Sequence, residues 1–166
     1  MNRTRARPRE ATGTVPLFRC DDVVSTSDDY YTPRWVFETM DLTFDLDVCT
    51  PPGGLPWIPA ARYYTRGDDG LAQDWLGRVW MNPPFSRPSP WVDRFIWHGH
   101  GVALLPVCNT AWGRRIWQRA DGVVMLRHPT KSHFEFAQGG GIPISCCVYA
   151  FGADCVEGIE RLGRAR

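Results

Sequence analysis

The most chemically specific stretch of the chain is Asn82-Pro83-Pro84-Phe85, which follows the apolar run Val79-Trp80-Met81. The apolar run is typical of a short buried strand. Each proline fixes its own φ angle, lacks a backbone donor and holds the preceding residue in an extended conformation. The Asn82 amide and the loop carbonyls can therefore face a ligand, beside the flat ring of Phe85. Two acceptors next to an aromatic ring suit a planar substrate with an exocyclic amino group.

The same tetrapeptide has a simpler structural interpretation. Asn-Pro and Pro-Pro are ordinary turn signals, and Phe85 could fill a core. In the functional interpretation, the Asn82 side-chain oxygen and the Pro83 carbonyl accept hydrogen bonds from the two amino hydrogens of the substrate. The nitrogen lone pair then points toward an electrophile, which is orientational and electrostatic catalysis. Such catalysis requires no covalent nucleophile, so it fits a chain without a Ser/His or Cys/His motif.

Apolar and amphipathic segments alternate along the chain, which predicts an α/β sandwich with a mainly parallel sheet. We expect residues 63–65 and 69–71 to lie on either side of a turn, a helical turn at 72–75 and an extended segment at 134–136. Ligands of such sheets bind beyond the carboxyl ends of the strands, where residues 47–50 and 82–85 would lie. The longer predicted elements are helices at 34–40, 91–97 and 112–120 and strands at 43–49, 78–81, 102–107, 122–126 and 143–151.

The size and composition predict one soluble domain. The chain has 166 residues, of which 43% are hydrophobic and 22% charged, enough for a real core in a single domain. Residues 1–24 mix arginine, threonine and proline without periodicity and are expected to form a flexible basic arm, followed by the domain at 25–166. No run approaches the ~20 apolar residues of a membrane span, and no apolar secretory segment follows the charged start. We therefore expect a cytoplasmic protein.

The cysteines and histidines do not predict a metal site. The six cysteines contain no C-x2-C pair, and several lie in apolar runs, where a free thiol behaves as a small hydrophobic side chain. His98 and His100 are two residues apart near glycines, and they lack neighbouring cysteine or carboxylate ligands. We expect no bound metal.

Four blocks of the sequence stand out by their order and spacing: Asp29-Tyr30-Tyr31-Thr32-Pro33, Phe44-Asp45-Leu46-Asp47-Val48-Cys49, Asp69-Gly70-Leu71 to Trp75, and Trp80-Met81-Asn82-Pro83-Pro84-Phe85-Ser86. Together they resemble the short phage-type DNA N6-adenine methyltransferases, the Dam-like family. Leu104-Leu105-Pro106-Val107 and Trp112 continue the resemblance, which extends from residue 28 to about residue 151.

This resemblance implies a Rossmann-like methyltransferase sandwich, reduced in size, that uses S-adenosylmethionine to methylate N6 of a flipped-out adenine in double-stranded DNA. It assigns the catalytic role to Asn82, Pro83, Pro84 and Phe85, with Phe85 stacking on the extruded base. It places Tyr31, Thr32, Pro33, Asp47, Cys49 and Asp69 at the cofactor.

The chain also departs from the family pattern. The usual glycine-rich cofactor loop is replaced by Thr50-Pro51-Pro52-Gly53-Gly54, and this leaves a non-catalytic nucleic-acid-binding protein as an alternative. Asp47 could instead partner a loop or helix, and Tyr31 could be a core residue. A methyltransferase acting on cytosine N4, an RNA base or a glutamine amide is the remaining alternative, because each offers a planar amino group.

A basic segment late in the chain predicts contacts with the phosphate backbone. Arg114, Arg115 and Arg119 lie within one predicted helix, and Lys131 follows it. Phosphate contacts of this kind give affinity and salt dependence but carry no sequence information. The net charge is only +1, so DNA would be attracted by this local cluster and by the basic arm rather than by the whole molecule. The oligomeric state stays open.

Overall fold

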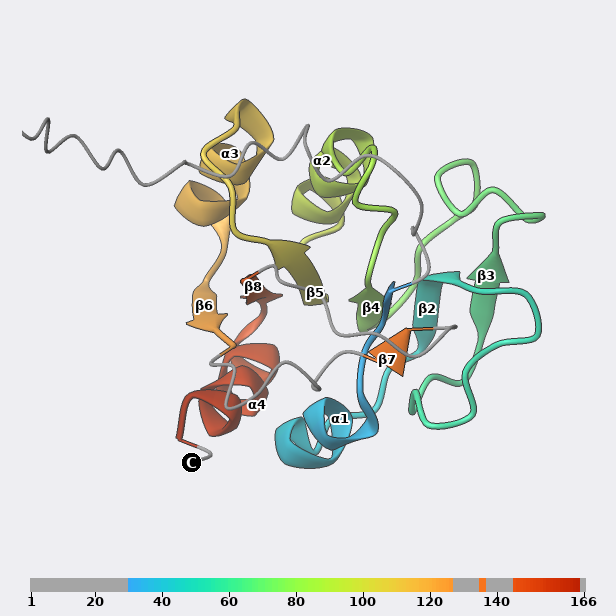
Figure 1. Ribbon diagram of the computed structural model, residues 1–166, viewed down its shortest axis with the longest axis horizontal. Helices are drawn as coiled ribbons and strands as arrows, with labels where there is room; N and C mark the ends of the chain where they lie inside the picture. The colour runs from blue at the N-terminus through green and yellow to red at the C-terminus, as the bar shows by residue number, and fades with distance from the viewer. Residues whose placement is uncertain (1–29, 127–134, 137–144, 165–166) are drawn as a thin grey trace, which may run out of the picture.

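The computed structural model describes residues 30–126, 135–136 and 145–164, and the basic arm predicted at 1–24 lies outside them. Figure 1 shows the path of the chain through its helices and strands. In chain order these are β1 (Tyr30–Tyr31), α1 (Arg34–Met40), β2 (Leu46–Thr50), β3 (Tyr63–Thr65), β4 (Val79–Met81), α2 (Ser89–His98), β5 (Gly101–Pro106), α3 (Ala111–Arg119), β6 (Gly122–Met125), β7 (Glu135–Phe136), β8 (Cys146–Phe151) and α4 (Ala153–Arg164).

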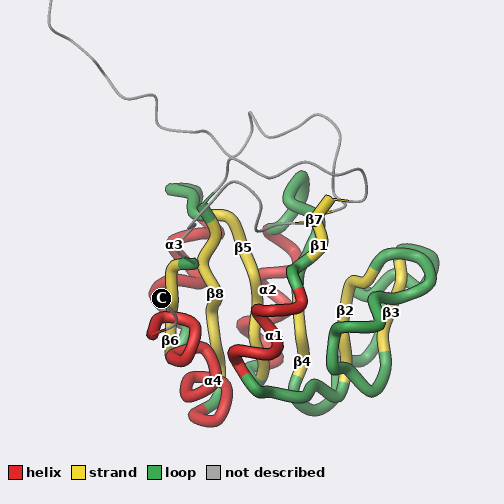
Figure 2. The backbone as a smooth tube through the Cα atoms, turned by 60° about the horizontal axis from the view of Figure 1, so that its bottom comes forward, coloured by secondary structure: helices red, strands yellow, loops and turns green. Residues whose placement is uncertain are grey.

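The main sheet has six strands in the order β3-β2-β4-β5-β8-β6. The pairs β2–β3, β2–β4 and β4–β5 are parallel, whereas β8 is antiparallel to both β5 and β6. The α/β class is confirmed, but the prediction of a mainly parallel sheet is wrong, because β8 inserts between β5 and β6 and makes the sheet mixed. The short antiparallel pair β1–β7 stands apart from the sheet, as Figure 2 shows.

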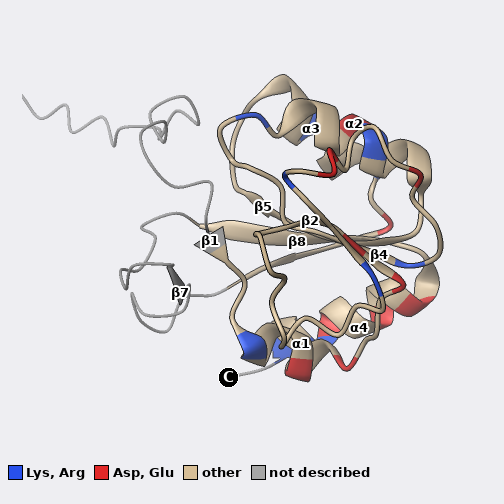
Figure 3. Cartoon of the chain, turned by 90° about the vertical axis from the view of Figure 1, so that its right-hand side faces the viewer, with Lys and Arg blue, Asp and Glu red and all other residues tan. Residues whose placement is uncertain are grey.

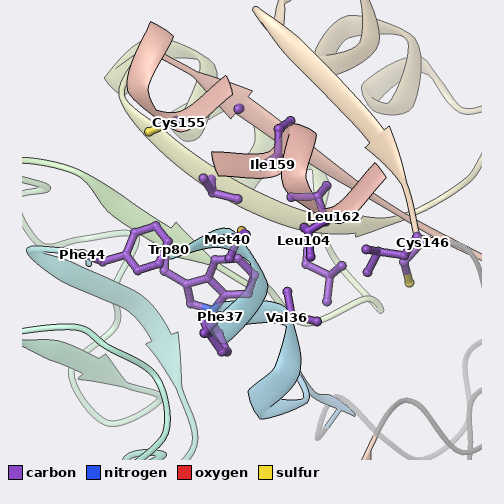
Figure 4. Close-up of a cluster of buried hydrophobic side chains, with 14 of the residues drawn as sticks. Val36, Phe37, Met40, Phe44, Trp80, Leu104, Cys146, Cys155, Ile159 and Leu162 are labelled. Atoms are coloured by element: carbon purple, nitrogen blue, oxygen red, sulfur yellow. The ribbon is translucent and has the colours of Figure 1, made fainter. Parts of the chain in front are cut away.

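Helices cover both faces of the sheet, so the domain has three layers. Figure 3 shows α2 and α3 on one face and α1 and α4 on the other. The second face is closed by a cluster in which Phe37 and Phe44 pack around the fully buried ring of Trp80, at centroid distances of 4.7 and 5.7 Å. Figure 4 shows this cluster with Ile159 and Leu162 reaching it from α4. Each such large side chain contributes about 1.5–3 kcal/mol of burial free energy.

The helices predicted from amphipathic spacing are confirmed within one or two residues. The C-terminal helix α4 was missed, although its buried residues Cys155, Ile159 and Leu162 recur at helical spacing. None of the described helices is long and apolar enough to cross a bilayer.

One short prediction between β2 and β4 is wrong. Residues 63–65 form the short strand β3 and are followed by the expected turn, but no helix forms at 72–75. The Arg94 guanidinium donates hydrogen bonds to the carbonyls of Leu71, at 2.6 Å, and of Gln73. The Trp75 indole donates to the carbonyl of Gly70 at 2.8 Å. Tertiary partners thus take the backbone acceptors that a local helix would have used.

Candidate active site

A cleft of about 520 Å³ opens where β2, β3 and β4 end, at the carboxyl edge predicted for ligand binding. This volume lies within the range of small-molecule and cofactor sites. The cleft is lined by the end of β2, the proline-containing loop after it, the turn after β3, the start of the Asn82 loop and one side chain of α2. The residues predicted from the sequence as site residues that line this cleft are Tyr31, Thr32, Asp47, Cys49, Asp69, Asn82 and Pro84.

Asn82 follows directly after β4 and is held at the cleft by the segment that leads into α1. Its side-chain nitrogen donates to the Thr32 hydroxyl at 3.3 Å. The Trp57 indole donates to the Thr32 carbonyl at 2.8 Å, which fixes this segment in turn. Thr32 is itself fully buried, so the Asn82 amide is oriented by a rigid neighbour.

The structure brings part of the predicted tetrapeptide to the cleft. Asn82 and Pro84 line it, whereas Pro83 and Phe85 are absent from its lining. Phe85 is 6% exposed and belongs to the core cluster around α1. Pro33, predicted at the cofactor, is buried at the start of α1 and does not line the cleft either. The stacking role of Phe85 therefore stays a prediction.

Asp47 is a buried carboxyl in the cleft wall, with 2% of its surface exposed. Burial raises its pKa to about 7, because the charged form loses its hydration. The Cys49 N–H donates to the carboxylate at 3.2 Å and opposes this rise of the pKa. The Thr50 hydroxyl, which forms no well-aligned hydrogen bond within the described chain, opposes it as well. A carboxyl of this kind can accept hydrogen bonds from a ligand that displaces water.

Cys49 lies beside Asp47 in the cleft, but it is not a nucleophile. Burial raises the pKa of its thiol well above the usual value, and the nearby Asp47 charge raises it further. The Asn82 backbone N–H only partly offsets these effects. The thiol therefore stays protonated at neutral pH and contributes shape and a weak donor.

An aromatic wall that the sequence did not reveal closes one side of the cleft. Trp91 of α2 lines it and stacks on Trp75, with ring centroids 6.2 Å apart and planes 27° apart. The Arg94 guanidinium lies 5.2 Å from the Trp75 centroid, which holds Trp75 in place. From the sequence, Trp91 was only the first residue of a predicted helix. The sequence feature that could have indicated its place in the cleft is its position shortly after β4 and the Asn82 loop.

Gly70 allows the chain to approach the end of β2 closely. A Cβ atom at Gly70 would lie 2.1 Å from the Val48 carbonyl oxygen and 3.2 Å from the Trp91 ring. The first contact is with backbone, so it cannot be relieved by a side-chain rotation. Glycine is thus required for the cleft to have its present shape.

We therefore expect Gly70→Ala to lower the free energy of unfolding by about 1–3 kcal/mol, the usual cost of inserting atoms into a packed site. Denaturant unfolding followed by tryptophan fluorescence measures the change. Gly67→Ala is the matched control, because its Cβ would meet only the Thr65 hydroxyl, at 3.6 Å. Equal unfolding free energies for the two variants would contradict the assigned role of Gly70.

Two charged side chains stand at the mouth of the cleft, after β3. Asp69, predicted from the sequence, is exposed and has a left-handed φ of 52°. Arg66, which the sequence analysis missed, lines the cleft beside it. Between them, Asp68 accepts hydrogen bonds from the Thr65 backbone N–H at 2.8 Å and from the Thr65 hydroxyl at 2.7 Å. These hydrogen bonds fix the turn that carries both charges.

The predicted DNA-contacting residues have different environments. Arg115 pairs with Asp93 at 2.7 Å and donates to the Ser89 hydroxyl at 3.1 Å, which joins α3 to α2. Arg114 and Arg119 are exposed. Lys131 lies outside the described residues. Arg114 and Arg119 thus keep the clearest access to a phosphate.

One cluster of potential metal ligands occurs within the described residues, away from the cleft. It consists of His100, Asp154 and Cys155. Asp154 already pairs with Arg78 at 2.5 Å, and the hydrogen bonds from Arg78 and His100 lower its pKa to about 2 against the opposing effect of burial. The adjacent guanidinium charge disfavours a cation at this place.

Comparison with known proteins gives two concordant matches. The family model described as DNA N-6-adenine-methyltransferase (Dam) matches residues 20–141. The DNA N-6-adenine-methyltransferase of Haemophilus phage HP1 (strain HP1c1) is 38% identical over 123 residues, which cover 68% of this chain and 68% of the phage protein. The matched region contains the end of β2, the Asn82 loop and the aromatic wall.

Proposed function

The chain belongs to the DNA N-6-adenine-methyltransferase (Dam) family, and from this premise we propose that it transfers a methyl group from S-adenosylmethionine to N6 of an adenine flipped out of double-stranded DNA. The observation that supports the proposal best is the position of Asn82. Its amide lies at the carboxyl edge of the sheet, oriented by Thr32, in the same cleft as the buried Asp47 carboxyl.

The cleft residues fit the proposed cofactor. A buried carboxyl such as Asp47 can accept hydrogen bonds from a ribose hydroxyl or an ammonium group. The Trp91 ring offers an apolar face for a purine, and Arg66 offers a counter-charge for a carboxylate. When bound, the cofactor supplies an electrophilic methyl group on a sulfonium sulfur, and the protein supplies binding, orientation and electrostatics.

The Asn82 loop acts on the target amine. In the proposal, the Asn82 side-chain oxygen and the Pro83 carbonyl accept hydrogen bonds from the two N6 hydrogens, which turns the nitrogen lone pair out of conjugation with the ring. The base must leave the duplex to reach them. Phe85 is the proposed stacking partner, and from its 6% exposed position it must turn out of the core cluster to contact an extruded base.

The phosphate backbone is proposed to contact the exposed residues Arg114 and Arg119, together with Lys131. Arg115 instead holds α2 and α3 together through Asp93. Each phosphate neutralised by an arginine or lysine adds about 0.9 to the slope of log affinity against log salt. Measurement of DNA affinity over a range of salt concentrations counts these contacts.

The raised pKa of Asp47 predicts that cofactor binding depends on pH. Ligand hydroxyl or ammonium donors bind the carboxylate, and with a pKa of about 7 only about one tenth of Asp47 is ionised at pH 6, against about nine tenths at pH 8. Binding should therefore tighten roughly tenfold from pH 6 to pH 8 and release a proton. Calorimetry in buffers of different ionisation enthalpy measures both effects, and the same pH dependence in Asp47→Asn would contradict this assignment.

The proposal as a whole is tested by incubating the protein with unmethylated DNA and S-adenosylmethionine. We expect S-adenosylhomocysteine to form in proportion to the DNA added. Cofactor binding without any DNA-dependent turnover would identify the chain as a non-catalytic relative, and no cofactor binding would overturn the assignment of the cleft.

A further inference from the structure

A second recess lies next to the active-site cleft and shares no lining residue with it. It has a volume of about 480 Å³ and lies beyond the end of β5. Its walls include Val107, Asn109, Arg114, Trp117, Gln118 and Tyr149. None of the residues proposed for catalysis or for cofactor binding lines this recess.

The recess opens at the same edge of the sheet as the Asn82 loop. Strands β4 and β5 are parallel neighbours in which Met81 pairs with Ala103, and adjacent strands lie about 4.8 Å apart. The segment that follows β5 into α3 therefore runs one strand away from the segment that follows β4 into α2, as Figure 1 shows. Any duplex that places an adenine at Asn82 along this edge passes the recess.

The side chains of the recess have the chemistry of nucleotide recognition. Arg114, Trp117 and Gln118 are spaced three and four residues apart in α3, which puts them on one face of the helix. The Arg114 guanidinium donates to the Asn109 side-chain oxygen at 3.0 Å, which fixes it at the rim. A guanidinium and amides are the side chains that read guanine and adenine edges, and an indole packs against bases and sugars.

Trp117 and Gln118 have no evident role in the fold itself. Trp117 is 59% exposed, and within the described ranges neither side chain makes a hydrogen bond, ion pair or ring contact. Helix α3 carries arginines and no acidic residue, so its exposed face attracts a polyanion. The acid nearest in the described contacts, Asp93, is already paired with Arg115.

We propose that this recess is a second DNA-contact site, which reads nucleotides flanking the target adenine and so contributes to sequence preference. Trp117 packs against a flanking nucleotide and the Gln118 amide hydrogen-bonds to a base edge, while Arg114 at the rim contacts the adjacent phosphate. The inference rests on the proposed function, because it requires DNA to lie across the carboxyl edge of the sheet.

The test compares Trp117→Ala and Gln118→Ala with Trp97→Ala, a control on α2 that is even more exposed, at 83%, and lines neither the cleft nor the recess. For each variant, the affinity for a short duplex is measured, and sequencing maps the methylated adenines on a random-sequence DNA library. Cofactor binding and thermal unfolding show that each variant is folded.

We expect Trp117→Ala to weaken duplex binding about 5- to 100-fold, the range of lost stacking contacts. Gln118→Ala should change the base preferred at a position next to the methylated adenine, and Trp97→Ala should change neither property.

Unchanged affinity and an unchanged methylation pattern in an active protein would overturn this inference and leave the proposed function intact. Weaker binding by both variants with an unchanged pattern would also overturn base reading, since it indicates backbone contact alone. If the wild-type protein bound DNA through Trp117 but methylated no adenine, the proposed function would fail while the recess remained a DNA-contact site.

Discussion

Asn82→Ala is expected to lower kcat for DNA methylation by on the order of 10²–10³-fold, the usual effect of removing one oriented polar group that stabilises a transition state. The amide is held by the Thr32 hydroxyl at 3.3 Å and lies in the cleft. Its loss leaves the N6 hydrogens with one acceptor fewer, while cofactor affinity and the free energy of unfolding should change little. A single-turnover experiment with DNA already bound measures the rate of methyl transfer separately from the affinity for DNA.

The matched control is Asn82→Asp, which retains a side-chain oxygen acceptor of similar size. We expect this variant to keep most of the rate, because its carboxylate can still accept from the amine. If Asn82→Ala methylated DNA at the wild-type rate, the amide would have no catalytic role and the loop would be only a structural turn.

Asp47→Ala is expected to weaken S-adenosylmethionine binding roughly 10- to 100-fold, since hydrogen bonds to a charged group contribute about 1.5–3 kcal/mol. Asp47 is 2% exposed, so water compensates poorly for its loss. The same change should stabilise the ligand-free protein above pH 7. The pKa of Asp47 is raised from 3.8 to about 7 in the folded protein. The wild-type protein therefore loses stability as the pH rises from 3.8 to about 7, because the buried carboxyl ionises less readily than it does in the unfolded chain.

Equilibrium dialysis or calorimetry at pH 8 measures the affinity, and unfolding at pH 5 and pH 8 measures the stability. Asp74→Asn is a suitable control, because Asp74 is an exposed acid that does not line the cleft. Retention of wild-type affinity in Asp47→Ala would remove this carboxyl from the cofactor site.

Periodicity and loop chemistry predicted much of the positioning framework. The apolar run of β4 and the two prolines after it place Asn82 at the edge of the sheet, and the amphipathic spacing of α1, α2 and α3 predicted these helices correctly. The direction of β8 could not be predicted in this way. A fully apolar strand fits a parallel or an antiparallel neighbour equally well, and its register is set by packing against β5 and β6.

The site was less accessible to sequence reasoning where it depends on long-range packing. Asp47 was found because it lies near the end of a recognisable strand, and Asn82 because it directly follows one. Trp91 reaches the cleft only because Trp75 and Gly70 fold against it from a segment with no regular structure. Arg115 looked equivalent to Arg114 in the helix pattern, but its partner Asp93 lies 22 residues away in the sequence.

The central claim is most directly tested by identifying the methylated nucleoside. Unmethylated duplex DNA is incubated with the protein and S-adenosylmethionine carrying an isotope-labelled methyl group, digested to nucleosides and analysed by mass spectrometry. We predict that the label appears in N6-methyldeoxyadenosine and that Asn82→Ala abolishes most of it. Label in N4-methyldeoxycytidine, or in no nucleoside of the DNA, would contradict the assignment.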